Sequence, residues 1–168
     1  MCPQCARVWD NGKALNPSMP ISDLNVNDYE ILLEPFADNK LNQILHCGNF
    51  GDVIASPTFI ETFDYSLDFT NTVQIETNGS ARKIDWWKDL AKRSKNKLIM
   101  VFSIDGLKDT NHIYRVGSTY EKIIENANAF INAGGKAVWQ FIEFEHNYHQ
   151  IEEAKHIAKD MGFTDFRV

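Results

Sequence analysis

Two cysteines near the start of the chain, Cys2 and Cys5, are separated by two residues in the sequence MCPQCAR. A Cys-x-x-Cys pair can form a disulfide, perform thiol redox chemistry or supply two thiolate ligands to a metal site. Three cysteines in 168 residues are too few for a disulfide framework, and a thioredoxin-like pair normally follows a strand. In a reducing compartment the pair is more often metal-binding or catalytic, so half of a zinc site and part of a metal cluster both stay open. Cys47, the third cysteine, is expected to be a small buried side chain.

Polar residues and glycines also gather in four short stretches, each of which follows an apolar stretch. Polar loops at the carboxyl ends of parallel strands converge on one face, which is where ligands bind in folds of that kind. This convergence is the main functional signal in the sequence. The four stretches are CGNFGD at 47–52, TNGS at 77–80, SIDG at 103–106 and EHN at 145–147.

The elements that position these loops alternate between strands and helices. Period-two alternation at Val73, Ile75 and Thr77 predicts one strand, and the continuous apolar run within 97–106 predicts a strand that is buried on both faces. Ser56, Ser118 with Glu121, and Asn147 with Gln150 have the spacing of helix caps. Strands are expected within 41–46, 71–77, 97–103, 136–147 and 165–168, and helices within 25–36, 56–69, 85–94, 117–135 and 149–162.

This alternation predicts an α/β fold with right-handed βαβ units and a parallel sheet. No strand precedes Cys2 and the last strand is short, so we expect one domain, residues 1–168, that is incomplete at both ends as part of a larger βα barrel. Gln140, Glu143 and Glu145 are candidates for polar residues in the barrel interior. Open edges of such a sheet can support self-association.

Composition excludes some classes of function. The net charge is −6 and no run of lysine or arginine is present, so nucleic-acid binding is not indicated. The longest apolar runs, such as 98–102, are far shorter than a membrane span, and no secretory signal pattern is visible. We therefore expect a cytoplasmic protein that does not associate with membranes.

With these elements in place, the chain resembles the core domain of the radical S-adenosylmethionine (radical SAM) superfamily, and in particular its SPASM and twitch members. That family carries a [4Fe-4S] cluster in a partial (βα)6 TIM-like barrel. Its pattern is Cys-x3-Cys-x2-Cys, and CPQC matches the last two cysteines. The first would lie three residues before Met1, which implies truncation at the first strand, as well as within the sixth.

The resemblance implies a metal site at Cys2 and Cys5 and a cofactor site in the loops. The stretch 47–52 takes the place of the family's Gly-Gly-Glu-Pro-like loop, which holds the methionine amino group, although its acidic residue is Asp52 and no proline follows. Arg115 would lie near the methionine carboxylate or the ribose, and Asn147 beside the adenosine. The implied cofactor-binding residues are Gly48, Asn49, Phe50, Gly51, Asp52, Thr77, Asn78, Ser103, Asp105, Arg115 and Asn147.

The resemblance also implies the activity and the partners. A [4Fe-4S] cluster would reduce S-adenosyl-L-methionine to a 5′-deoxyadenosyl radical, which abstracts hydrogen from an unknown substrate, either a small molecule or a peptide, with a low-potential electron donor as partner. The alternative is a non-catalytic or truncated α/β domain that binds SAM, zinc or a protein. At single residues, Asp52 and Asn147 could act as helix caps, and Arg115 could pair with an acid.

Overall fold

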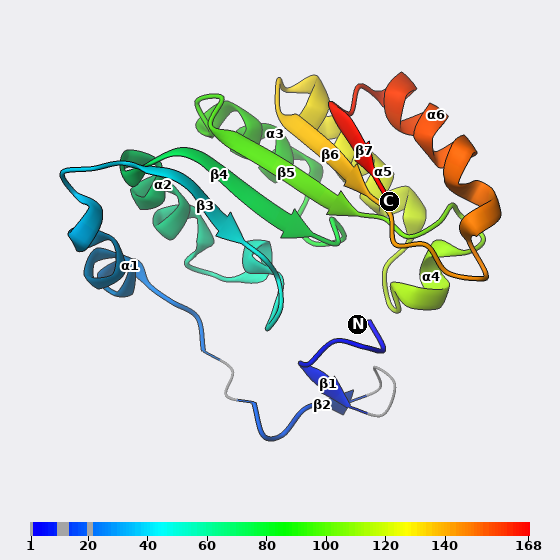
Figure 1. The fold of residues 1–168 in the computed structure, drawn as a ribbon, viewed down its shortest axis with the longest axis horizontal. Helices are drawn as coiled ribbons and strands as arrows, with labels where there is room; N and C mark the ends of the chain where they lie inside the picture. The colour runs from blue at the N-terminus through cyan, green and yellow to red at the C-terminus, as the bar shows by residue number, and fades with distance from the viewer. Residues whose placement is uncertain (1, 10–13, 20–21) are drawn as a thin grey trace.

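A computed structural model describes residues 2–9, 14–19 and 22–168. Its centre is a five-stranded, entirely parallel sheet in which the order of the strands is their order in the chain (Figure 1). This arrangement confirms the predicted α/β fold with a parallel sheet. The strands are β3 (Leu41–His46), β4 (Thr70–Thr77), β5 (Leu98–Ser103), β6 (Lys136–Gln140) and β7 (Asp165–Arg167).

Helices connect consecutive strands, and α2, α3 and α5 cover one face of the sheet (Figure 1). No helix in the described ranges is long and apolar enough to cross a membrane. The helices are α1 (Val26–Leu33), α2 (Phe59–Phe69), α3 (Ile84–Arg93), α4 (Asn111–Tyr114), α5 (Tyr120–Asn132) and α6 (Ile151–Met161), with 3-10 turns η2 (Glu34–Phe36), η3 (Val53–Ala55) and η4 (Tyr148–Gln150).

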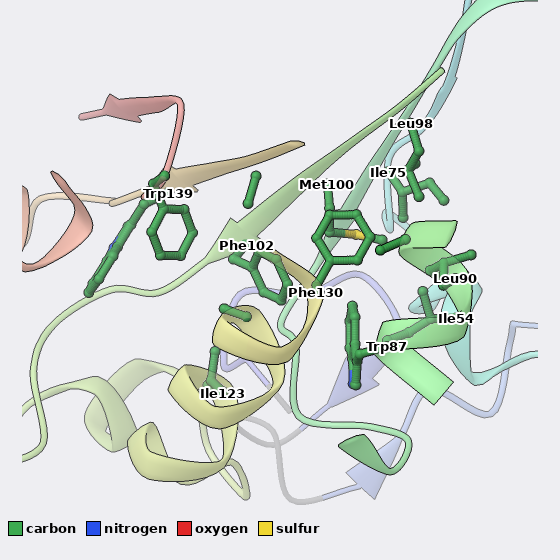
Figure 2. Close-up of a cluster of buried hydrophobic side chains, with 14 of the residues drawn as sticks. Ile54, Ile75, Trp87, Leu90, Leu98, Met100, Phe102, Ile123, Phe130 and Trp139 are labelled. Carbon is green, nitrogen blue, oxygen red and sulfur yellow. The ribbon is translucent and has the colours of Figure 1, made fainter. Parts of the chain in front are cut away.

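The hydrophobic core lies between the sheet and these helices (Figure 2). Met100 and Phe102 of β5 are fully buried there, and the ring of Phe102 lies 5.3 Å from that of Trp87 on α3 and 6.3 Å from that of Phe130 on α5. Burial of aromatic side chains of this size supplies much of the stabilisation of a small domain. Because Met100 and Phe102 are two residues apart, they lie on the same face of the sheet, and this apolar face is the one that the helices cover.

The opposite face of the sheet is more polar. Gln74 and Glu76 on β4, Ser103 on β5 and Gln140 on β6 occupy alternate positions and are only partly buried. Because residues two apart along a strand share a face, these side chains point away from the helix layer. This face forms the floor of the site described below.

Within the described residues the sheet does not close into a barrel, and β3 and β7 are its edge strands. The predicted final strand is present as β7. A short antiparallel hairpin, which the sequence did not predict, is formed by β1 (Val8–Trp9) and β2 (Ala14–Leu15) and lies beyond the arrowheads of the central strands (Figure 1). Strands of two residues are too short to produce a recognisable alternation.

The predicted helix caps were wrong in most cases. The helices α2, α5 and α6 have no side-chain cap hydrogen bond, because the hydroxyl of Ser118 donates to the carbonyl of Arg115 and that of Ser56 pairs with the hydroxyl of Thr58. A full capping box is formed instead at α1, by Asn25 and Asp28. Gly134, with φ of 91°, follows the end of α5 as predicted.

Candidate functional site

A cavity of about 550 Å³ lies at the carboxyl ends of β3 to β6. It brings together residues that are more than 100 positions apart in the sequence, as the convergence of the strand ends predicted. Of the residues predicted for the site, those that line it are Cys2, Cys5, Gly48, Asn49, Gly51, Asp52, Thr77, Asn78, Ser103 and Arg115. Three predicted residues, Phe50, Asp105 and Asn147, do not line it, for the reasons given below.

The two cysteines lie in a turn in which the amide of Cys5 donates to the carbonyl of Cys2 at 3.1 Å. Both thiols are free and half-buried, and the guanidinium of Arg115 donates from Nη1 to Cys2 Sγ at 3.3 Å. Cys47 is exposed rather than buried, because it lies in the loop just beyond the end of the edge strand β3. The prediction of a buried Cys47 was therefore wrong.

The glycine loop after β3 is covered by Arg7, which donates from Nη1 to the carbonyl of Phe50 at 3.2 Å. At Gly51 the backbone has φ of 152°, and a Cβ there would lie 2.2 Å from Arg7 Nη1, so glycine permits this close approach. The side chain of Phe50 is 69% exposed and lies outside the cavity lining. The side chain of Phe50 is thus not part of the cavity lining, and the prediction that this loop binds the cofactor stays a prediction.

Asp52 is held by three donors. Its carboxylate accepts hydrogen bonds from Thr77 Oγ1 at 2.7 Å, from the amide of Asn78 at 3.1 Å and from the amide of Ile54 at 3.4 Å. The last of these caps the turn η3, as one of the two alternatives for this residue predicted. Burial raises the pKa of Asp52, while the donors from Thr77 and Asn78 oppose that shift.

Asp105 and Arg115 form a buried ion pair. The carboxylate of Asp105 is completely buried; one oxygen accepts from Arg115 Nε and the other accepts from the amide of Ile142 at 2.8 Å. Burial raises the pKa of Asp105, and the guanidinium opposes that shift. Asp105 therefore lies behind the cavity wall and not in the cavity, whereas Arg115 both pairs with an acid and faces the cavity.

Asn147 is completely buried, and its amide group is engaged with the backbone. It donates to the carbonyls of Asp105 and Ile142, both at 2.9 Å, and accepts from the amide of Phe144 at 2.7 Å. Its side chain caps no helix, so that prediction was wrong. It does not line the cavity, and the prediction that it lies beside the adenosine stays a prediction. It joins the loop after β5 to the loop after β6.

The sequence reasoning missed several residues that line the cavity, notably Arg7 and Glu76. The sequence did indicate the position of Glu76. The alternation that assigns Ile75 and Thr77 to the helix face of the sheet assigns Glu76 to the other face, which forms the floor of the cavity. Nothing in the sequence indicated Arg7, because it lies in the irregular N-terminal segment. Gln140 lines the cavity as predicted for a barrel-interior residue, whereas Glu143 and Glu145 are exposed and lie outside it.

The cavity therefore combines charges of both signs with neutral hydrogen-bonding groups. Arg7 and Arg115 supply cations, Asp52 and Glu76 supply carboxylates, and Cys2 and Cys5 supply two thiols. A ligand with an amino-acid portion, which is itself zwitterionic, suits such a lining.

No protein-family model matches the chain, and no curated protein matches it. Solved structures do match. SuiB of Streptococcus suis with S-adenosylmethionine bound has a TM-score of 0.72 at 19% identity, over 89% of this chain and 34% of SuiB. SuiB bound to its precursor peptide SuiA has a TM-score of 0.75 at 18% identity, over 99% of this chain and 35% of SuiB. Native anSMEcpe with bound AdoMet has a TM-score of 0.69 at 15% identity, over 100% of this chain and 48% of that chain.

These structural neighbours are radical SAM enzymes, and at such low identities the likeness shows the fold. The chain has the partial TIM-like architecture that the resemblance implied. It spans about a third to a half of the length of the solved structures it matches.

Proposed function

We propose that this chain forms the core of a radical SAM enzyme. It would bind S-adenosylmethionine in the cavity, where Cys2 and Cys5 would supply two of the thiolates of a [4Fe-4S] cluster. The chemistry that such a cluster would supply is one-electron reduction of S-adenosylmethionine, which yields a 5′-deoxyadenosyl radical able to abstract hydrogen from a substrate. One observation carries the proposal: Cys2 and Arg115, which are 113 positions apart, meet at one cavity with the predicted loops. The shared fold with two proteins that bind S-adenosylmethionine supports it.

The residues of the chain would bind and orient this ligand. Arg115 has five N–H donors, of which Asp105 and Cys2 use two, so others remain for the methionine carboxylate. Ser103 and Asn78 offer neutral hydrogen bonds from the cavity wall. Holding the ligand in a walled cavity at the strand ends fixes its orientation and limits access of water.

The thiols fit a cluster only in part. The family pattern uses three thiolates, and the described residues place two, Cys2 and Cys5, at this cavity. Cys47 lies outside the lining, and the described part of the chain contains no group of three histidine, cysteine or acidic residues arranged to hold a metal. The set of donors within these residues is therefore incomplete for a [4Fe-4S] cluster.

That incomplete set favours a second candidate function, a non-catalytic α/β domain that binds S-adenosylmethionine, zinc or a protein partner. For the first candidate, we expect a cytoplasmic setting, a low-potential electron donor and a substrate that is a small molecule or a peptide. The match to SuiB in complex with its precursor peptide favours a peptide.

Calorimetric titration with S-adenosylmethionine tests the first candidate and the form of the second that binds this molecule. Ser103→Ala removes one hydrogen-bonding group from the cavity, and we expect it to weaken binding by about 2- to 10-fold. The matched control Phe50→Ala changes an exposed side chain outside the lining and should leave the affinity unchanged. Absence of binding to the unmodified chain would contradict the proposal.

Iron and sulfide content separates the two candidates. Both would be measured per chain after anaerobic reconstitution, in this chain and in one extended to carry a cysteine four residues before Cys2. About four irons per extended chain support the radical enzyme, with Cys2 and Cys5 as two of the three ligands. An iron-free protein in both cases supports the binding domain.

A further inference from the structure

Three polar side chains lie side by side on the cavity floor: Glu76 of β4, Ser103 of β5 and Gln140 of β6. Ser103 and Gln140 are direct partners in the sheet register. Glu76 is the partner of Val101, two residues before Ser103, so it lies on the same face one step deeper. The end of the sheet thus presents a carboxylate next to two neutral hydrogen-bonding groups.

Glu76 differs from the other charged side chains of the lining, because each of those has a partner. Arg115 binds Asp105 and Cys2, Asp52 accepts three hydrogen bonds, and Arg7 donates to a backbone carbonyl. Within the described ranges, no hydrogen bond or ion pair involves the carboxylate of Glu76. Asp52, the acid that the resemblance assigned to an amino group, is thus already engaged, and Glu76 is the carboxylate left free.

The surroundings of Glu76 make its charge costly once water is displaced. Its neighbours on the same face in the register are Val101 and, across β5, Val138, which are 0% and 2% exposed. A ligand that fills the cavity removes water from this carboxylate. An unpaired buried carboxylate is strongly unfavourable, whereas one that meets a cation and hydrogen-bond donors is not.

We propose that Glu76 is the cation-recognising residue of the cavity and that Ser103 and Gln140 supply the neutral hydrogen bonds beside it. The ligand places a positively charged group, a sulfonium, ammonium or guanidinium, against Glu76. This inference rests on the proposed function and deepens it. The cation comes either from S-adenosylmethionine, which carries a sulfonium and an ammonium, or from a second molecule that shares the cavity.

The experiment compares the unmodified chain with Glu76→Gln, which removes the charge and keeps the size. Glu61→Gln, at an exposed position of α2, is the matched control. Calorimetry gives the affinity for S-adenosylmethionine and for S-adenosylhomocysteine, the thioether that lacks the sulfonium charge. Saturation-transfer NMR in the presence of saturating S-adenosylmethionine detects binding of agmatine, which carries an ammonium and a guanidinium.

Each arm identifies one source of the cation. If Glu76 meets the sulfonium, Glu76→Gln weakens S-adenosylmethionine binding by about 10-fold or more and leaves S-adenosylhomocysteine binding unchanged. If it meets the ammonium, both ligands weaken alike. If the cation belongs to a second molecule, both affinities are retained and the agmatine signal is lost.

The inference is overturned if all three ligands bind Glu76→Gln as they bind Glu61→Gln. A chain that binds S-adenosylmethionine but shows that result refutes this inference alone, whereas a chain that never binds S-adenosylmethionine refutes the proposed function. Should Glu76→Gln fail to fold, Glu76→Met, which also removes the charge at similar length, is compared with Glu76→Asp, which keeps the charge: the first should bind several-fold more weakly than the second, and equal binding would overturn the inference.

Discussion

The cavity has two walls that are built in opposite ways. The wall formed by the loops after β5 and β6, here called the β5–β6 wall, contains the fully buried Asp105 and Asn147. The side chain of Asn147 donates to the carbonyls of Asp105 and Ile142, and the carboxylate of Asp105 accepts from the amide of Ile142. The N-terminal wall, formed by residues 2–8 and 47–51, is half-buried or exposed except at Val8. The hydrogen bond from Arg7 to Phe50 joins the two segments of this wall. The bond from Arg115 to Cys2 attaches the wall to the rest of the described molecule.

This difference separates scaffold from ligand-binding surface. In the β5–β6 wall the polar groups satisfy each other, so the wall keeps its shape without a ligand. In the N-terminal wall the thiols and the glycine loop have few hydrogen-bond partners. Contacts with a bound ligand or metal would therefore do much to fix the conformation of this wall. Arg115 connects the two walls, because it contacts Asp105 behind one and Cys2 in the other.

The largest effect is expected in the β5–β6 wall. Asp105→Ala deprives the largely buried guanidinium of Arg115 of its counter-ion and leaves the amide of Ile142 without this acceptor, and should lower the free energy of unfolding by about 3–5 kcal/mol. Thermal denaturation would show a fall in Tm of about 6–20 °C. The control Asp64→Ala breaks the exposed pair with Arg93 and should cost at most about 1 kcal/mol. Equal losses in the two variants would refute the distinction.

Two glycine substitutions should show the next largest contrast. A Cβ at Gly79, where φ is 71°, would lie 2.7 Å from the buried ring of Phe102, so Gly79→Ala should cost about 2–4 kcal/mol. At Gly51 the Cβ would meet only the flexible end of Arg7, so Gly51→Ala should cost roughly 1–2 kcal/mol. Denaturant titration measures both, and a larger loss at Gly51 than at Gly79 would contradict the description of the N-terminal wall as loosely held.

The pH dependence of stability should reveal Asp52. Because burial raises the pKa of Asp52, the folded chain binds this proton more tightly than the unfolded chain. The stabilisation that comes from protonating Asp52 is complete at pH values below its pKa in the unfolded chain, about 4. It is lost as the pH rises through the pKa of Asp52 in the folded chain. The unfolding free energies of the unmodified chain and of Asp52→Asn would be measured from pH 7 to pH 4. As the pH falls, the unmodified chain should gain stability relative to Asp52→Asn. A constant difference, or a shift the other way, would count against this assignment.

The smallest effect on stability is expected in the N-terminal wall. Cys5→Ser changes a half-buried thiol in a loosely held turn, so the unfolding free energy of the metal-free chain should change by no more than about 0.5 kcal/mol. Metal content should respond much more strongly. In the extended chain, Cys5→Ser should bind far less iron than Cys47→Ser. A destabilised Cys5→Ser variant would mean that this turn has a structural role of its own.

The sequence predicted the strands and the main helices because alternation of apolar residues records burial. Val73 and Ile75 show the period of a strand, and both are completely buried against the helices. Helix caps were predicted poorly, because a hydroxyl such as that of Ser118 can reach several backbone groups and its spacing does not decide among them.

The positions of the loops were predicted better than the directions of their side chains. Asp105 and Asn147 look like ligand-binding residues in the sequence, but both are turned into the wall, where backbone groups of a neighbouring loop need partners. Nothing in the local sequence distinguishes a polar side chain that faces a cavity from one that supports its wall. Glu76 was missed for the opposite reason, since its strand position was read only for its apolar neighbours.

The order of the strands has a consequence for how the chain reaches this structure during synthesis. Because the sheet order β3-β4-β5-β6-β7 follows the sequence, each strand pairs with the one made just before it, and no strand must wait for a distant segment. The sheet can therefore grow one strand–helix unit at a time as the chain leaves the ribosome. Pulse-labelling hydrogen exchange on stalled nascent chains should show protection of β4 before that of β6.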